Sequence, residues 1–340
     1  MPGYIKPPSN QYIYSSSTVD GARIMTAASE YGFRNKLING NFAVWQRGTS
    51  FNIGSNSNTF CADRWQIQSQ GGTAVASQQT FTPGILSGIE TPYYLRLVQS
   101  AGTANTLVIN RLEDVRTLAG QSITVSYLAK ASASTTITAR FDQDFGSGGS
   151  SRAANGGNSN TITTSWARYS STFTVASITG KTIGSSSYVE FFLYYPNTAS
   201  ITVELAGVQI EAGTVVTPFE YRPQQIELAM CQRYYERINL GLGNSQSFGN
   251  GNVIAGNIMD NPYMYKVEKR TSSVSLDYSN AQVYVTGYGV FSGGTWSLYN
   301  TNTMQAVLRY THTSSPWTGA PIGWTYGSSS PAYLGFSAEL

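Results

Sequence analysis

Between residues 36 and 222 the chain consists of short runs in which apolar and polar positions alternate, the pattern of half-buried β-strands. Turns rich in Gly, Ser, Asn and Asp separate the runs at fairly regular intervals. No long helical pattern lies between them, so they predict an antiparallel β-sandwich or barrel rather than a parallel sheet. The runs read LINGNFAVWQRG, DRWQIQS, YYLRLVQS, NTLVINRL, SITVSYLAK, TTITARFDQ, ARYSSTFTV, YVEFFLYY and ITVELAGVQIE.

One segment of this region lacks the strand pattern. Residues 146–160 read GSGGSSRAANGGNSN, in which Gly and Asn dominate. We predict a long surface loop there.

The pattern changes within residues 200–237. Apolar side chains first recur with a period of two, and beyond Pro223, which a first helical turn tolerates, they recur with helical spacing. We predict a helix over residues 223–237. It has two apolar stripes, one of Ile226, Met230 and Tyr234 and one of Leu228, Cys231 and Tyr235. A helix needs only one stripe to pack on its own chain, so we expect Ile226, Met230 and Tyr234 to contact another copy.

Residues 238–340 are again β-rich, with about seven short strands that predict a compact antiparallel sandwich. Their connecting loops, GYGVFSGGTW, THTSSPWTG and GWTYGSSSP, combine Gly with aromatic residues. Loops on a rigid β-scaffold commonly carry recognition residues, and aromatic rings with few charges suit glycans. The alternative is that the rings pack the domain or a subunit interface. The candidate glycan-binding residues are Trp296, Trp317, Trp324, Tyr326, Tyr288 and His312.

Residues 1–35 form a predicted arm, because their Pro, Ser and Thr cannot supply a core. Paired apolar residues such as Tyr4, Ile5, Tyr12 and Ile13 favour docking on a partner over a free linker.

Composition narrows the class of protein. Only 11% of the 340 residues are charged, against about 25% in an ordinary soluble domain. The net charge of +3 is spread along the chain without a basic run, so we expect no nucleic-acid partner. No apolar stretch approaches the roughly 18 residues of a membrane span, and the N-terminus does not resemble a signal peptide. We expect no membrane insertion, and release by lysis if the protein acts outside the cell.

The cysteines and acidic residues give no strong sign of a bridge, metal or cofactor. Cys61 and Cys231 are expected to be buried reduced thiols. Asp142 and Asp144, followed by Gly146, are two possible calcium ligands, but the later acidic ligands of a calcium loop are missing. We therefore predict no metal site and no cofactor.

Catalysis also has little support. His312 is the one histidine, and no nucleophile–base system has a recognisable local signature. Two carboxylates could hydrolyse a glycosidic bond, but nothing selects a pair from the candidates Glu190, Glu204, Glu211 and Glu220. We expect a protein that is not an enzyme.

Several motifs resemble a module common in bacteriophage and prophage virion proteins, mainly tail fibres. They are LINGNFAVWQRG, ADRW, TTSWARYSSTFTV, VQIEAGTVVTPFEYRP and CQRYYER, and more weakly the final YLGFSAEL. The opening and closing motifs also resemble the end strands of jelly rolls found in many carbohydrate-binding modules. The resemblance implies an all-β chain made of a docking arm (1–35), a jelly-roll β-sandwich (36–222), a linker helix (223–237) and a small antiparallel β-sandwich tip (238–340).

Some residue roles follow from this resemblance. Related sugar-binding jelly rolls often hold a structural calcium near their first and last strands, where this chain has Asn39, Asn41 and Glu211. Trp45, Trp65 and Trp166 lie in strand-like patterns, where large rings usually fill the core; the alternative is a sugar platform. For Arg47, Asp63 and Arg64 we expect ion pairs at strand ends rather than ligand contacts.

The resemblance and the patterns together predict a non-enzymatic virion protein, a tail fibre or receptor-binding protein that adheres to host-surface polysaccharide. We expect a homotrimer whose arm binds other virion proteins, with weak contacts adding through multivalency. The first alternative is a head fibre or decoration protein anchored to the capsid or neck. The second is a polysaccharide depolymerase.

Overall fold

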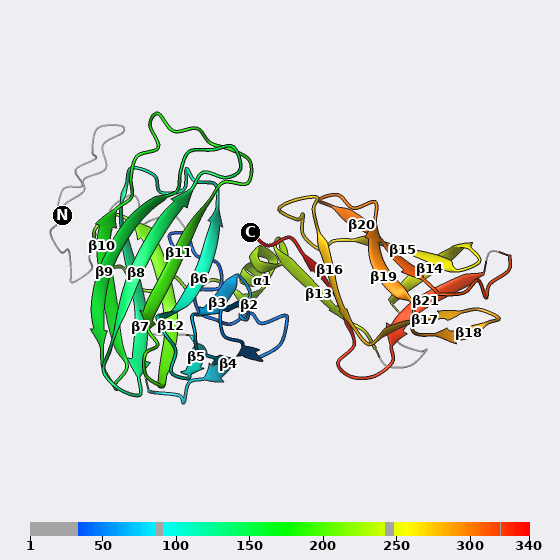
Figure 1. The fold of residues 1–340 in the computed structure, drawn as a ribbon, viewed down its shortest axis with the longest axis horizontal. Coiled ribbons are helices and arrows are strands. Elements are labelled where there is room, and N and C mark those ends of the chain that lie inside the picture. Colours follow the sequence, from blue (N-terminus) through cyan, green and yellow to red (C-terminus); the bar gives the residue numbers. More distant parts are fainter. Residues whose placement is uncertain (1–32, 86–90, 242–247, 320) are drawn as a thin grey trace, which may run out of the picture.

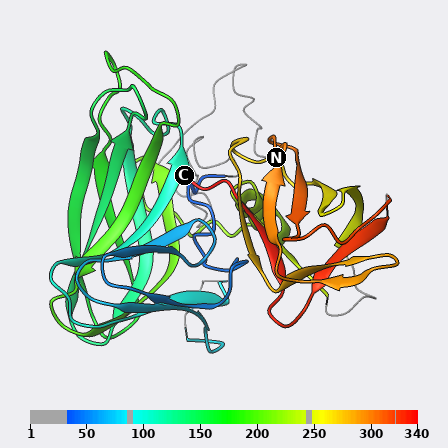
Figure 2. The same cartoon turned by 45° about the vertical axis from the view of Figure 1, so that its right-hand side comes forward.

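The computed structural model describes residues 33–85, 91–241, 248–319 and 321–340, so the predicted arm lies almost entirely outside the described residues. Two β-rich bodies lie side by side with one short helix between them (Figures 1 and 2). The prediction of an all-β chain is confirmed. No helix in the described ranges is long and apolar enough to cross a membrane.

The larger body is a jelly-roll sandwich of two antiparallel sheets. The β12 sheet has the strand order β1 (Ser50–Ile53), β4 (Ala74–Thr80), β5 (Tyr93–Gln99), β12 (Ile201–Ala212), β7 (Ser122–Ala131) and β10 (Ala167–Thr174). The β11 sheet has the order β2 (Ser57–Phe60), β3 (Trp65–Ser69), β6 (Asn105–Glu113), β11 (Tyr188–Pro196), β8 (Thr135–Asp144) and β9 (Ala153–Ile162). Alternate residues of each strand point inward, and Trp65, Tyr127, Phe141 and Phe191 fill the space between the sheets.

The first predicted strand, LINGNFAVWQRG, is instead a buried irregular segment. Asn39 and Phe42 have left-handed φ values of 59° and 52°, which a continuous strand excludes. The Asn39 amide donates to the carbonyls of Val44 (2.8 Å) and Asp63 (2.9 Å), replacing the missing ladder bonds. Gly40 lies so close to Val208 that a Cβ would be 2.1 Å from its carbonyl oxygen, so the Asn-Gly pair is required here.

The predicted loop over residues 146–160 was wrong in its second half. Ala153–Ile162 form β9, which pairs with β8 at the edge of the β11 sheet. Most of its side chains are exposed, so the strand leaves no apolar alternation in the sequence. Its position is fixed by backbone pairing and by Asn158 and Asn160, whose amides donate to the Thr172 carbonyl (2.8 Å) and the Ser171 hydroxyl (3.0 Å) of β10.

The helix α1 spans Gln224–Gln232 and is shorter than the predicted 223–237. From Tyr235 the chain is extended again, because Tyr235–Asn239 form β13 and pair with β22 (Tyr333–Ser337). The predicted oligomer stripe is divided: Ile226 is exposed, Met230 is half-buried, and Tyr234 is buried within its own chain. Tyr234 is therefore not available to another copy of the chain. For Ile226 and Met230, contact with another copy stays a prediction.

The smaller body packs two further antiparallel sheets. One contains β13, β22 and β16 (Ser275–Ser279). The other has the order β18 (Gly289–Phe291), β17 (Ala281–Val285), β21 (Ile322–Gly327), β14 (Phe248–Ala255), β15 (Ile258–Met264), β20 (Gln305–Thr311) and β19 (Thr295–Tyr299). Met259, Val283, Leu308, Leu334 and Phe336 belong to its core.

Residues of the distant motifs WQRG, ADRW, CQRYYER and AEL meet where the two bodies join. Glu339 forms ion pairs with Arg47 (3.3 Å) and Arg64. The Arg64 guanidinium lies 3.4 Å from the Tyr234 ring centre, and the Arg47 guanidinium lies 3.5 Å from that of Tyr235. We call these five residues the joint. Ion pairs do form at Arg47 and Arg64, as expected, but they connect the two bodies.

Three side chains beside the joint are also buried, those of Asp63, Cys61 and Cys231. Asp63 accepts hydrogen bonds from the backbone (2.9 Å) and side chain of Gln46, and burial raises the pKa of Asp63 to about 6. Cys61 and Cys231 are buried and unpaired, as expected, and burial raises the pKa of the Cys61 thiol to about 12.

Candidate functional site

The six predicted glycan-binding residues do not form one site. Trp296, Trp317 and Tyr326 are only 7%, 2% and 3% exposed. Trp296 packs on Tyr310 with ring centres 5.1 Å apart, and Trp317 packs on Phe291 at 5.3 Å. In this structure the three rings are interior residues and offer no face to a sugar.

The other three residues are more accessible but dispersed. Trp324 is half-buried and stacks on Tyr284 across neighbouring strands, with ring centres 4.5 Å apart. Tyr288 is exposed in the turn after β17, where its hydroxyl accepts a hydrogen bond from the Thr318 backbone (2.9 Å). His312 is half-buried against Phe291. For these three, glycan binding stays a prediction.

A different aromatic group lies on the jelly roll, on the outer face of the β12 sheet. Phe81, Tyr94 and Trp166 contact one another, with ring centres 4.7 to 5.4 Å apart, and cover Leu128 and Ala206. Leu128 and Ala206 face outward because the neighbouring Ala129 and Leu205 belong to the inner core. We call these five residues the outer aromatic cluster. Trp45, Trp65 and Trp166 were expected in the sandwich core: Trp65 lies deep inside it, Trp45 is partly buried against it, and Trp166 lies on the outer face instead.

A row of three charged side chains crosses the same face. Glu204 of β12 pairs directly with Arg96 of β5 and with Lys130 of β7, so the strand register places all three on one line. Glu204 Oε1 lies 2.6 Å from Arg96 Nε, and Oε2 lies 2.8 Å from Lys130 Nζ. Arg96 also donates to the Tyr94 hydroxyl (3.0 Å), and Lys130 Nζ lies 5.5 Å from the Trp166 ring centre. The charged row therefore adjoins the outer aromatic cluster.

The charged row lines an open pocket of about 340 Å³, which we call the β12-face pocket. That volume is within the range of small-ligand sites. Its remaining walls contain short polar and apolar side chains of Val98, Ala131, Ser132 and Thr202. The accessible ring beside this pocket is that of Trp166, which is half-buried, since Tyr94 is only 8% exposed. An aromatic face beside hydrogen-bonding groups is the chemistry that a pyranose ring requires, because its C–H face is apolar and its rim is polar.

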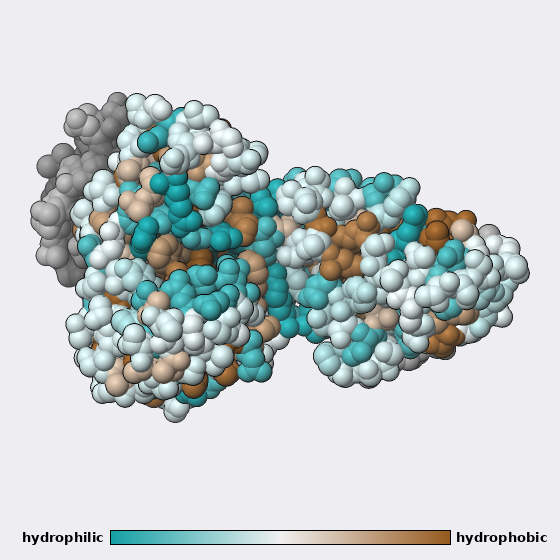
Figure 3. Space-filling view, viewed as in Figure 1, coloured by the Kyte–Doolittle hydropathy of each residue, from teal (hydrophilic) through white to brown (hydrophobic). Residues whose placement is uncertain are grey.

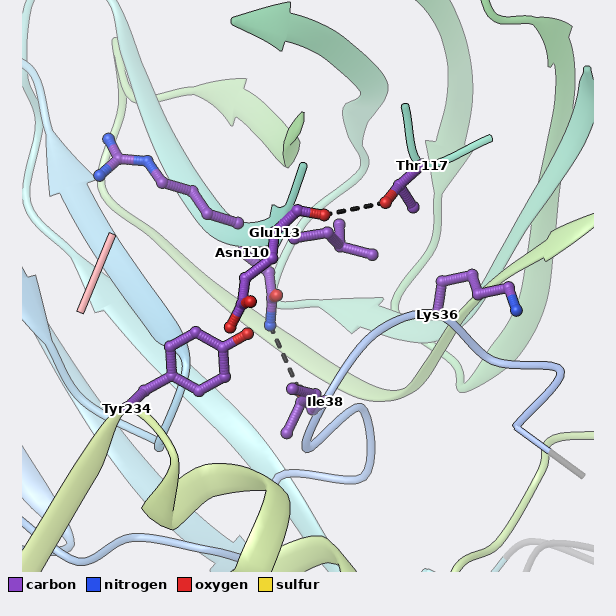
Figure 4. A pocket seen from close by; sticks show the side chains of 8 residues that line it. Lys36, Ile38, Asn110, Glu113, Thr117 and Tyr234 are labelled. Atoms are coloured by element: carbon purple, nitrogen blue, oxygen red, sulfur yellow. Dashed lines mark hydrogen bonds between the residues drawn. The ribbon is translucent and has the colours of Figure 1, made fainter. Parts of the chain in front are cut away.

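A second pocket, of about 220 Å³, lies beside the joint (Figure 4). Its polar groups already have structural partners: Glu113 binds Arg233 through both oxygens (2.8 and 2.9 Å), and Asn110 donates to the Ile38 carbonyl. Burial opposes ionisation of Glu113, but the hydrogen bonds from Arg233 outweigh it and lower the pKa of Glu113. We regard this pocket as part of the structural connection between the bodies.

The outer face of the β11 sheet carries a dense arginine–carboxylate network. Glu190 binds Arg111 (2.7 Å) and Arg152 (2.5 Å), and Asp142 binds Arg152 (3.0 Å) and Arg140 (2.7 Å). A hydrophilic area covers β8, β11 and β6 in Figure 3. Burial opposes ionisation of Glu190, but the arginine hydrogen bonds outweigh it and lower its pKa. A general acid needs a raised pKa, so Glu190 is poorly suited to that role.

The remaining candidate acids are also engaged. Glu211 accepts hydrogen bonds from Thr217 (2.6 and 3.0 Å), and Glu220 accepts from the backbones of Arg34 (3.1 Å) and Asn35 (2.7 Å). Asp142 gives both oxygens to arginines, and the Asn39 amide binds carbonyls, so neither proposed calcium position presents a free ligand set. Among the described residues, no three His, Cys, Asp or Glu side chains are grouped to hold a metal.

Comparison with known proteins gives partial similarities only. No protein-family model and no curated protein matches the chain. Among solved structures, the enzymatically active domain of tailspike protein 4 from bacteriophage CBA120 has 12% identity and a TM-score of 0.33, over 53% of this chain and 22% of that one. The family 11 carbohydrate-binding module of Clostridium thermocellum, in complex with a mixed-linked tetrasaccharide, has 13% identity and a TM-score of 0.30, over 49% of this chain and 97% of the module.

An arabinose-bound α-L-arabinofuranosidase is also similar, with 17% identity and a TM-score of 0.38 over 61% of this chain. The chain spans 31% of that enzyme and 22% of the tailspike domain. TM-scores of 0.30 to 0.38 assign neither a ligand nor an activity to this protein.

Proposed function

We propose that this protein is a non-enzymatic adhesin, a bacteriophage virion protein of the tail-fibre type that binds host-surface glycans through its jelly roll. The observation that carries the proposal is the outer face of the β12 sheet. There, the half-buried ring of Trp166 adjoins the open β12-face pocket, which is lined by Arg96, Lys130 and Glu204. Of the described residues that line the pocket beside the joint, Tyr234 is a buried ring and Glu113 is already bound by Arg233.

The virion assignment is supported by the motifs that resemble phage fibre modules. Their residues Arg47, Arg64, Tyr234 and Tyr235 hold the two bodies together through ion pairs and ring contacts. A fibre must transmit force between its modules, and a buried connection suits that role. The homotrimer, the docking of the arm and the virion location belong to this proposal.

A binding role is favoured over hydrolysis by the state of the carboxylates. Glu190 and Asp142 face each other in neighbouring strands, but both are ion-paired with arginines. Glu204 is likewise held between two cations. A depolymerase would need one carboxylic acid that retains its proton at working pH.

Three experiments test the proposal. The full chain is applied to an array of bacterial-surface glycans, where we expect selective binding that Trp166→Ala removes; an array without binding contradicts the adhesin. Antibody labelling of particles locates the protein, and labelling confined to the head would favour the capsid-anchored alternative. Release of new reducing ends from a bound polysaccharide would contradict the non-enzymatic role.

A further inference from the structure

We propose that the β12-face pocket binds its glycan through a carboxylate group, so that the ligand is an acidic glycan containing uronic or sialic acid. This inference rests on the proposed adhesive function and specifies its ligand class. It is drawn from the distribution of charge within the charged row.

The two cations and the carboxylate differ in exposure. The side chain of Glu204 is 5% exposed, whereas those of Arg96 and Lys130 are 36% and 33% exposed. A ligand entering from solvent therefore meets the cations first. One carboxylate between two cations also leaves one net positive charge, which a second carboxylate would neutralise.

The buried glutamate positions the two cations. Oε1 holds Arg96 by its Nε, and Oε2 holds Lys130 by its Nζ. Two flexible side chains are thereby fixed on either side of Glu204 before a ligand arrives, which lowers the entropy cost of binding. Glu204 is thus a positioning residue rather than a group that contacts the glycan.

Hydrogen-bonding capacity remains on both cations. An ammonium group has three N–H donors and a guanidinium has five. In the described part of the chain, Arg96 uses Nε for Glu204 and Nη2 for Tyr94, and Nη1 has no hydrogen-bond partner. Lys130 makes one ion pair, with Glu204. The free donors can bind a ligand carboxylate with charge-assisted hydrogen bonds, which are stronger than neutral ones.

The surroundings favour a sugar over a simple anion. Lys130 lies over the half-buried Trp166 ring, so this cation and this ring adjoin each other at the surface. The Tyr94 ring is buried, and its hydroxyl accepts a hydrogen bond from Arg96. Val98 is 46% exposed and provides an apolar patch in the lining of the pocket. A pyranose ring can contact the aromatic and apolar surface while its carboxylate reaches the cations.

Positive charge extends along the same face. Arg168 of β10 is exposed in the row next to Lys130, since it pairs with Leu128 of β7. It is held by the Ser126 hydroxyl (3.0 Å) and by the Thr217 carbonyl. The neighbouring carboxylate on this face, Glu211, is 1% exposed. Arg168 would therefore attract a second acidic sugar of a longer oligosaccharide, in addition to the one bound at Arg96 and Lys130.

The test compares oligosaccharides that contain uronic or sialic acid with their carboxyl-reduced forms, using the full chain and calorimetric titration. Loss of a charge-assisted hydrogen bond should weaken binding about tenfold. We expect that loss for carboxyl reduction, for Lys130→Gln and for Arg96→Gln. The matched control is Lys181→Gln, which removes an equal charge from the exposed loop between β10 and β11 and should leave binding unchanged.

The outcomes separate this inference from the proposed function. Equal binding of acidic and reduced glycans, abolished by Trp166→Ala but not by Lys130→Gln, would overturn the acidic ligand and leave the adhesin intact. Absence of binding to every glycan would overturn both. Binding of an acidic peptide, but of no acidic glycan, would identify a protein partner and also overturn the inference. Thermal unfolding of each variant shows that it is folded.

Discussion

The joint and the charged row of the β12 sheet are built from similar types of side chain but differ in their exposure to solvent. Each sets a glutamate between two cations and places aromatic rings beside them. At the joint the side chains of Arg64 and Arg47 are only 1% and 13% exposed, and aromatic rings lie under both guanidinium groups. On the β12 sheet the cations are about one-third exposed and retain free donors. Solvent access, more than residue type, therefore separates the ion pairs of the joint from those of the proposed binding site.

The largest expected effect is at the joint. Arg64→Met removes the partner of Glu339 and leaves that carboxylate, 6% exposed, with Arg47 alone. Breaking a buried pair typically costs about 3–5 kcal/mol, so we expect a loss of this size in the free energy of unfolding by urea. The control is Arg116→Met, whose pair with Asp114 is exposed and should contribute under about 1 kcal/mol. Equal small losses in both variants would show that the joint is no more than a surface contact.

A second prediction concerns the pH dependence of the joint region. Burial raises the pKa of Asp63 from its ordinary value of 3.8 to about 6 in the folded protein, so the folded state binds the proton more tightly. The stabilisation from protonated Asp63 is full below about pH 4 and is lost as the pH rises through about 6. The corresponding change is about 3 kcal/mol. Urea unfolding between pH 4 and 7 should show this decline in the wild type and not in Asp63→Asn; identical slopes would contradict it.

The outer aromatic cluster should contribute less to stability. Trp166→Ala removes a half-buried ring from Phe81 and Tyr94 and should cost about 1–2 kcal/mol, since only part of its surface is buried. The conservative Trp166→Phe variant keeps a ring at this position and should retain most of the stability and the glycan binding. A loss as large as that of Arg64→Met would indicate that the cluster is a second core.

The smallest expected effect on stability is that of Glu204→Gln. Arg96 and Lys130 can turn to water when the carboxylate is neutralised, so the free energy of unfolding should fall by less than about 1 kcal/mol. The same measurement on Glu339→Gln should show the larger loss expected for the joint. If Glu204→Gln lost about 3 kcal/mol or more, the charged row would be structural and the contrast with the joint would disappear.

The sequence predicted the strands whose inward residues are apolar, such as YVEFFLYY and ITVELAGVQIE, because burial on one face imposes a period of two. It did not predict β9, which has few buried side chains, or the left-handed turn at Asn39. The strands β1, β2 and β4 were missed for a similar reason, since they are short or carry mostly polar residues.

The site was harder to predict than the fold. Glu204 was one of four candidate acids, but its partners Arg96 and Lys130 lie far away in the sequence and meet it only through the register of β5, β12 and β7. A single sequence does not specify that register. The aromatic loops were misleading for another reason: Trp296 follows a Gly-rich segment but lies in strand β19, where it is the buried member of the alternation and belongs to the core of the smaller body.

The polar edge strand β9 affects how closely neighbouring molecules can be placed without pairing through their sheet edges. An open sheet edge with flat apolar residues recruits strands from neighbouring molecules and leads to aggregation. Here the outermost strand is mostly Gly, Asn and Ser, and a register shift near Gly156, whose φ is 89°, disturbs its regular ladder. Such an edge is a poor template for strand addition. A molecule displayed in many copies at close spacing would thereby remain separate from its neighbours.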